Sequence, residues 1–197
     1  MARTQAKDYH DKRAAILKTS AKLFGRDGYG RTSMAGVAAS CGVSKALLYH
    51  YYQNKEELLF DILFNHLNEL VKVVNDAASL DIEAEQRLGA MIEGLLELYR
   101  DADDEHRVQT GSLSALPEKR QTELKNLERQ LVKAFSSVLK EVVPTLAEPG
   151  APLLPVTMSL FGMLNWHYMW FRKDGKITRS DYSKIVKTLI LEGARKL

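Results

Sequence analysis

The stretch from Pro149 to Phe171 most constrains what this chain can fold into, because it contains no Asp, Glu, Lys or Arg. Uncharged runs of about 18 residues or more are candidates for transmembrane helices. Three prolines interrupt the first part of this run, and proline removes a hydrogen-bond donor and clashes inside a helix. The uninterrupted part, Val156–Phe171, would rise only about 24 Å as a helix, short of the ~30 Å hydrocarbon core of a bilayer. We therefore expect a buried helix of a soluble chain, without a membrane partner.

The apolar side chains of Val156–Phe171 point to every side of the expected helix. A helix that is apolar all round must be buried all round. One side can face the chain's own core or a cavity, and the opposite side then needs a partner. The last expected helix, near 180–196, has an ordinary apolar stripe, so two helices from each of two copies could form a symmetric four-helix interface. We predict a homodimer.

The rest of the chain has apolar residues at helical spacing and lacks the period-two runs of β-branched residues that predict strands. We predict an all-α fold of about nine helices. They are expected near 9–27, 33–40, 44–51, from 54 through at least 74, 82–99, 117–143, 156–173 and 180–196, with a short helix or loop in the ambiguous segment 101–116.

Charge is concentrated at the beginning of the chain. Residues 1–55 carry ten Lys and Arg against three Asp, about +7, which leaves about −4 for residues 56–197 from a total of +3. A basic first quarter predicts a polyanion partner for that part alone, although a solubilising basic face is the alternative. An architectural protein that wraps nucleic acid is disfavoured, because wrapping needs positive charge along the whole molecule.

Residues 33–51 contain a helix, a turn with Gly42 and a second short helix, which is the helix-turn-helix arrangement. Gly42 permits the sharp turn because it has no Cβ. In the second helix Lys45 can meet guanine or phosphate, and small apolar side chains can touch thymine methyl groups. A cation at Lys55, in the first turn of the next helix, opposes the helix dipole. It is explained by a bound phosphate, or by solvation beside two glutamates.

Spaced motifs in this region resemble the N-terminal domain of TetR-type bacterial transcription regulators. They are Phe24–Tyr29, Thr32–Met34, Val37–Ala38, Gly42–Lys45 and Leu48–Leu59. The resemblance implies a homodimeric repressor that a small ligand releases from double-stranded operator DNA. It divides the chain into a helix-turn-helix DNA-binding domain at 1–55 and a ligand-binding and dimerisation domain at 56–197. The implied phosphate contacts are Thr32, Ser33, Tyr49 and Lys55, and the implied base-facing residues are Lys45, Ala46, Leu47 and His50. Gly36 departs from the family pattern, where an acidic residue is usual.

The segment 161–175 resembles members of the same family that respond to acyl-CoA or aryl-CoA thioesters. Its composition suits an apolar slot for an acyl group, with amide or phenol groups near a carbonyl and a cation near phosphates. The ligand candidates are Tyr99, Phe161, Asn165, Trp166, Tyr168, Met169 and Arg172, each of which could equally be core or dimer packing. A multidrug or antiseptic sensor is the alternative, but such sites favour acids beside aromatics, and these candidates include none.

Other function classes lack their signatures. The five histidines are scattered, without the i,i+4 spacing of a helical metal site, and no Gly-rich phosphate loop is present. The sequence therefore predicts no enzyme, no metal centre and no cofactor. The single cysteine, Cys41, fits a reducing compartment, and Met1–Arg13 lacks the pattern of a secretory signal, so we expect a cytoplasmic location. We interpret Cys41 as a small buried filler and Tyr52 as core.

Overall fold

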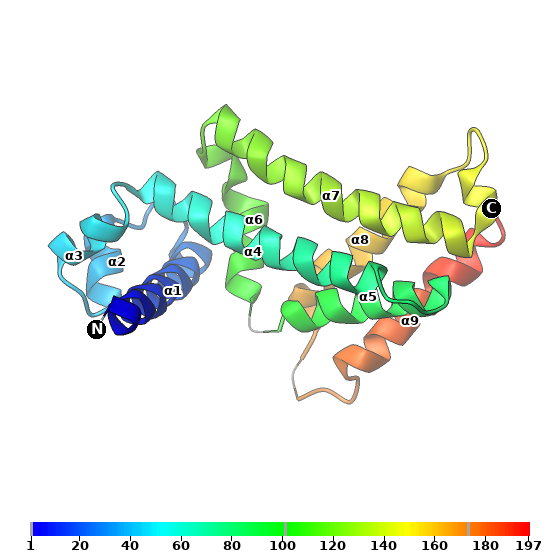
Figure 1. Ribbon diagram of the computed structural model, residues 1–197, viewed down its shortest axis with the longest axis horizontal. Coiled ribbons are helices and arrows are strands. Elements are labelled where there is room, and N and C mark those ends of the chain that lie inside the picture. The colour runs from blue at the N-terminus through cyan, green and yellow to red at the C-terminus, as the bar shows by residue number, and fades with distance from the viewer. Residues whose placement is uncertain (1, 101, 173) are drawn as a thin grey trace. The chain divides into compact units, whose positions relative to one another are not determined.

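The computed structural model describes residues 2–100, 102–172 and 174–197, and these residues form helices without a strand (Figure 1). The predicted all-α fold is confirmed. The α-helices are α1 (Ala2–Asp27), α2 (Met34–Ser40), α3 (Lys45–Tyr51), α4 (Lys55–Ala78), α5 (Ala84–Leu98), α6 (Asp103–Ser112), α7 (Glu118–Val142), α8 (Leu153–Trp170) and α9 (Arg179–Ala194). Two short 3-10 turns, η1 (Leu113–Ala115) and η2 (Pro144–Ala147), precede α7 and follow it. The predicted end of a helix at 173 falls outside the described residues.

The chain divides into two compact units. The first comprises residues 1–67 and 102–124, and the second comprises 68–101 and 125–197, so α4 and α7 each contribute to both. The first compact unit therefore contains the first part of α4 and all of α6 in addition to the three N-terminal helices. The boundary after residue 55 is a division by function, and it stays a prediction.

In the first unit, the apolar stripe of α1 and the helix-turn-helix share one core. Ile16, Phe24, Val37 and Leu48 are each at most 2% exposed. Helix α6 packs along α1. The two helices approach closely at Gly25, where an added Cβ would lie 3.1 Å from a carboxylate oxygen of Asp104 and 3.3 Å from its carbonyl oxygen. The ambiguous segment after residue 101 is therefore a helix held by tertiary contacts.

The helix starts expected near residues 33, 44 and 54 are confirmed, and a polar side chain caps each of them. Ser33 and Ser44 each accept a hydrogen bond of 3.1 Å from the backbone N–H three residues later. Asn54 accepts one from the N–H of Glu57 at 2.8 Å. The Glu57 carboxylate accepts the N–H of Gln53 at 2.9 Å, so the return bond of a capping box goes here to the residue before the cap. Gly42 has a φ of +65°, the left-handed conformation that the turn between α2 and α3 requires.

In the second unit, α9 packs against both α5 and α8. The Tyr182 hydroxyl of α9 donates a hydrogen bond of 3.0 Å to the carbonyl oxygen of Met163 in α8. Helix α8 begins three residues before its predicted start and contains Pro155 in its first turn. The backbone N–H groups of a first turn have no partner within the helix, so a proline there removes no helical hydrogen bond. Within the described residues, no helix is long and apolar enough to cross a membrane.

Candidate nucleic-acid interface and effector site

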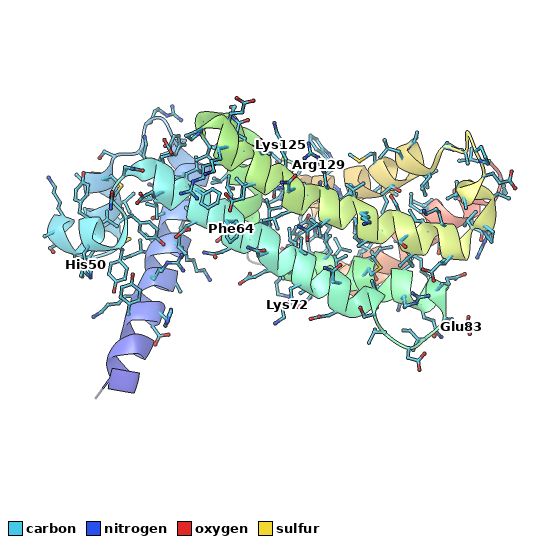
Figure 2. All side chains as sticks on the ribbon, turned by 45° about the horizontal axis from the view of Figure 1, so that its top comes forward. His50, Phe64, Lys72, Glu83, Lys125 and Arg129 are labelled. Carbon is cyan, nitrogen blue, oxygen red and sulfur yellow. The ribbon has the colours of Figure 1, made fainter. Side chains whose placement is uncertain are left out.

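Helix α3 turns a mixed polar and apolar face outward. It is anchored by Leu48, which is fully buried. The side chains of Lys45, Ala46 and His50 are exposed, and Tyr49 is 50% exposed. Figure 2 marks His50 on this helix. The predicted base-facing residues thus lie on the accessible side of the helix, except Leu47, which is half-buried.

An aromatic stack fixes the end of α3 against α1. The rings of Tyr9 and Tyr51 stack with centroids 4.6 Å apart and an interplanar angle of 24°. The His50 ring meets Tyr51 edge to face at 5.8 Å. The sequence analysis missed this contact, because no periodicity relates Tyr9 to a residue in another helix.

The N-terminus of α2 presents Ser33 but not Thr32. Ser33 is exposed, and its oxygen accepts the N–H of Gly36, so its hydroxyl hydrogen can still be donated outward. Thr32 is only 8% exposed, and its hydroxyl donates to the carbonyl oxygen of Gly28 at 3.0 Å. Since a hydroxyl has one hydrogen to donate, the implied phosphate contact is not available to the Thr32 side chain.

Lys55 binds the loop between α1 and α2. Its ammonium group donates to the carbonyl oxygens of Tyr29 at 2.7 Å and Thr32 at 2.9 Å, with that of Gly30 at 3.4 Å. It also lies 4.4 Å from the centroid of the Tyr29 ring. These carbonyls explain a cation in the first turn of α4 without a phosphate. A phosphate contact by Lys55 stays a prediction, and it would require the ammonium to give up one of these acceptors.

Two side chains interpreted as structural differ in burial. Tyr52 is 3% exposed, as predicted for a core residue. Burial is the main cause that raises the pKa of its phenol, and the nearby Asp61 carboxylate adds to it. Cys41 is only half-buried, but burial raises the pKa of its thiol, so the reactive thiolate is disfavoured.

In the second unit, the structure brings two of the predicted ligand residues together. The hydroxyl of Tyr99, which follows α5, donates to the amide oxygen of Asn165 in α8 at 2.8 Å. Tyr99 is 6% exposed, and burial raises the pKa of its phenol, so the hydroxyl stays protonated and able to donate. Phe161 is buried against Phe135, with ring centroids 5.2 Å apart. Tyr168 is half-buried.

The other three ligand candidates are exposed on α8 or directly after it. Trp166 is 62% exposed, Met169 is 56% exposed, and Arg172 is exposed. They are therefore not buried within the single subunit, and their role in binding a ligand stays a prediction. The sequence showed apolar residues all round α8 but not which side α9 and the core would cover.

The exposed side chains on α8 and α9 form one set, which we call the outer apolar face. In α8 four of its members lie at multiples of four residues from one another, as on one face of a helix, and Met169 lies beside them. The members are Leu154, Met158, Trp166, Met169 and Trp170 of α8, with Ile185 and Leu189 of α9. Exposed apolar side chains gathered on neighbouring helices are a candidate interaction surface.

Metal chemistry has no support among the described residues. In the parts of the chain that the structure describes, no three His, Cys, Asp or Glu side chains are grouped so that they could hold a metal ion.

Two family models match the chain and together cover most of it. Residues 16–62 match "Bacterial regulatory proteins, tetR family", and residues 81–194 match "Tetracyclin repressor-like, C-terminal domain". The first range contains α2, α3 and the start of α4, and the second contains α5 to α9.

Curated relatives are transcriptional regulators. The chain is 29% identical over 98 residues to the transcriptional activator FasR of Mycolicibacterium smegmatis, a match that spans 50% of this chain and 45% of that protein. It is 20% identical to the transcriptional regulator YhgD of Bacillus subtilis over 93% of this chain and 96% of that protein.

Solved structures share the whole architecture. A TetR-family regulator from Bordetella parapertussis is 31% identical, with a TM-score of 0.86 over 94% of this chain and 96% of that chain. AibR, solved in complex with isovaleryl coenzyme A and operator DNA, is 26% identical, with a TM-score of 0.77 over 90% of this chain and 97% of that chain.

Proposed function

Because the chain belongs to the TetR family of bacterial transcriptional regulators, we propose that it is a repressor that binds a palindromic operator as a homodimer and is released by a small-molecule effector. The observation that carries this proposal is the outward face of α3, held by Leu48 and by the stack of Tyr9 on Tyr51. A rigid short helix with exposed polar side chains is what readout of base edges in the major groove needs.

Within that interface, each group has a role that its chemistry supports. Lys45 and His50 donate hydrogen bonds to base edges, and Ala46 contacts thymine methyl groups. Ser33 and Tyr49 donate their hydroxyl hydrogens to phosphates, which fixes the register on the duplex. The exposed part of the half-buried Leu47 side chain contributes to this DNA-facing surface.

The outer apolar face supports the homodimer. Trp166, Trp170 and Leu189 are between 46% and 62% exposed in one subunit. Trp and Met are enriched at the centres of protein interfaces, and a two-fold pairing of α8 and α9 would bury both copies of this face at once. The dimer would set the separation of its two α3 helices, and hence the spacing of the two half-sites.

We propose an acyl-CoA or aryl-CoA thioester as the effector. AibR, which shares the fold and 26% of its residues, was solved with isovaleryl coenzyme A. The hydrogen-bonded pair of Tyr99 and Asn165 offers polar groups in apolar surroundings, where a thioester carbonyl can be oriented. The effector would release DNA only if it binds more tightly to the state with the weaker operator affinity.

One titration tests these statements together. Fluorescence anisotropy would follow binding to a duplex from the region upstream of the chain's own gene, in the presence of isovaleryl-CoA, free isovaleric acid or a cationic dye. We expect release by the thioester alone and a reduced response in Asn165→Leu, with Asn75→Leu, an exposed asparagine on α4, as the matched control. Release by the dye alone would favour the multidrug alternative, and a sedimentation mass of one chain at micromolar concentration would exclude the dimer.

A further inference from the structure

A basic groove lies along α1 in the first unit, apart from the residues discussed above. It has a volume of about 460 Å³ and is open to solvent. Five α1 residues and the last residue of α2 line it: Lys18, Thr19, Lys22, Leu23, Arg26 and Ser40.

The cations of the groove form one row. Lys18, Lys22 and Arg26 are four residues apart, so they lie above one another on the same side of α1. Like charges at this spacing destabilise a helix by a few tenths of a kcal/mol per pair, so the row works against the stability of α1. Among the described residues, Lys18 and Lys22 have no carboxylate partner, whereas Arg26 is bonded twice to Asp27, both at 2.7 Å. The row therefore retains a net positive charge.

The groove offers two kinds of group that bind phosphate oxygens, the ammonium groups and the hydroxyl of Ser40, whereas the hydroxyl of Thr19 is hydrogen-bonded to the Cys41 thiol. Both lysines are exposed. Each such contact is weak in a high dielectric, so it suits a polyanion that makes several contacts better than a single small anion. Three cations at four-residue intervals span about 12 Å along α1. One strand of B-DNA presents a phosphate about every 3.4 Å of its axis, so a backbone of that length carries three to four charges.

The lining of the groove is also close in sequence to the predicted reading helix. Ser40 ends α2, and Lys45 begins α3 after the tight turn at Gly42. One turn of chain therefore joins the lining of the groove to the first residue of α3.

We propose that the groove of α1 binds the phosphodiester backbone of duplex DNA that flanks the segment read by α3. This inference rests on the proposed function, and it adds a contact surface outside the helix-turn-helix. It would extend the footprint and increase affinity for any sequence, without changing the preference among bases.

The test compares Lys18→Gln/Lys22→Gln with Lys72→Gln/Lys125→Gln. The control removes the same charge from exposed lysines on α4 and α7 (Figure 2). Anisotropy would be measured from 50 to 200 mM salt on a duplex that ends at the operator core and on one with six more base pairs at each end. In the groove variant we expect the slope of the logarithm of DNA affinity against the logarithm of salt concentration to be shallower by up to about 1.8. This corresponds to DNA binding that is weaker by at most roughly 60-fold at 0.1 M salt. The six additional base pairs at each end, which increase the affinity of the wild type, should no longer increase that of the groove variant. The ratio of its affinity for the operator to its affinity for an operator with one base changed should equal that of the wild type.

Three outcomes would overturn the inference. In the first, the groove variant has the same salt slope as the control and gains as much affinity from the flanking base pairs. In the second, the groove variant has a different base preference. In the third, tripolyphosphate binds to the wild type but not to the groove variant, while the salt slope on DNA stays the same. The last result would make the groove a site for small anions. A wild-type chain that binds the operator no better than random duplex refutes the proposed function instead, and that result is separate from the comparison of variants. Unfolding temperatures equal to that of the wild type would show that both double variants are folded.

Discussion

Replacing Lys55 by Met would show what holds the loop between α1 and α2. Methionine keeps an apolar stem of similar length and removes the ammonium that donates to the carbonyl oxygens of Tyr29 and Thr32. Hydrogen bonds from a charged donor contribute about 1.5–3 kcal/mol each. Partial exposure of Lys55 reduces this to about 1 kcal/mol each, and the contact with the Tyr29 ring adds about 0.5 kcal/mol. Relief of the unfavourable helix dipole returns about 0.5 kcal/mol. The net expected loss is about 2 kcal/mol.

Differential scanning calorimetry can measure that loss. For a chain of this length, about 2 kcal/mol corresponds to a decrease in Tm of roughly 4–8 °C. Lys72→Met, on the exposed side of the same helix, is the matched control and should leave Tm within about 1 °C, as surface substitutions usually do. Amide exchange supplies a local readout. The N–H of Thr32 bonds to the carbonyl oxygens of Gly28 and Tyr29, and it should exchange faster in the Lys55→Met variant.

The alternative role of Lys55 makes the opposite predictions. If its ammonium contacts a phosphate and contributes little to the loop, Lys55→Met would keep the Tm of the wild type and lose about 0.9 of the salt slope on operator DNA. That pair of results would refute our assignment. A lower Tm with an unchanged slope supports it, provided that binding is measured well below the Tm of the variant.

Three further predictions concern stability. Gly36→Ala should raise the free energy of unfolding by up to about 1 kcal/mol, because an added Cβ lies at an ordinary contact distance of 3.4 Å; a lower urea midpoint would contradict this. Gly94→Ala should lower the free energy of unfolding by about 1–3 kcal/mol, since the added Cβ would lie 2.7 Å from a methyl carbon of Val73. Gly89→Ala in the same helix should be neutral or stabilising, and equal unfolding temperatures of the two variants would refute this difference. Burial, with a smaller effect from a second histidine, lowers the pKa of His66 to about 4, so the unfolded chain takes up this proton first as the pH falls. Stability should decrease by up to about 3 kcal/mol between pH 6.5 and pH 4, and this part of the pH dependence should be absent in His66→Leu.

Local chemistry made most helix boundaries predictable. The capping residues Ser33, Ser44 and Asn54 lie next to the helices that they begin, so a single segment of sequence contains the whole signal. Helix α6 has no such signal. Its first turn is acidic and only a few of its side chains are buried, so it becomes a helix because α1 covers it, with Gly25 allowing the approach.

The candidate sites were predictable to the same extent. The motif around α3 identified the outward residues, because the turn and the buried Leu48 determine the rotation of a short helix. The sequence also indicated that Lys55 needs an acceptor, but the carbonyls of a loop far away in sequence could not be identified from it. For α8, periodicity predicted two apolar sides but not which of them α9 would leave exposed, and the roles of Trp166 and Met169 depend on that choice.

The hydrogen bonds of Lys55 also indicate how an effector signal could reach the DNA-binding residues. Helix α4 is continuous from Lys55 to Ala78, and in the second unit it meets α5 where Gly94 leaves no space for a side chain beside Val73. Helix α4 contains no proline or glycine, so a local bend would have to disturb its i to i+4 hydrogen bonds, and the helix can transmit a displacement along its axis. At its start, the ammonium of Lys55 is bonded to the carbonyl of Thr32, the residue before the Ser33 that caps α2. If the chain binds an operator as proposed, a shift at the start of α4 would move the cap of α2 or break these hydrogen bonds, and either result would change operator affinity.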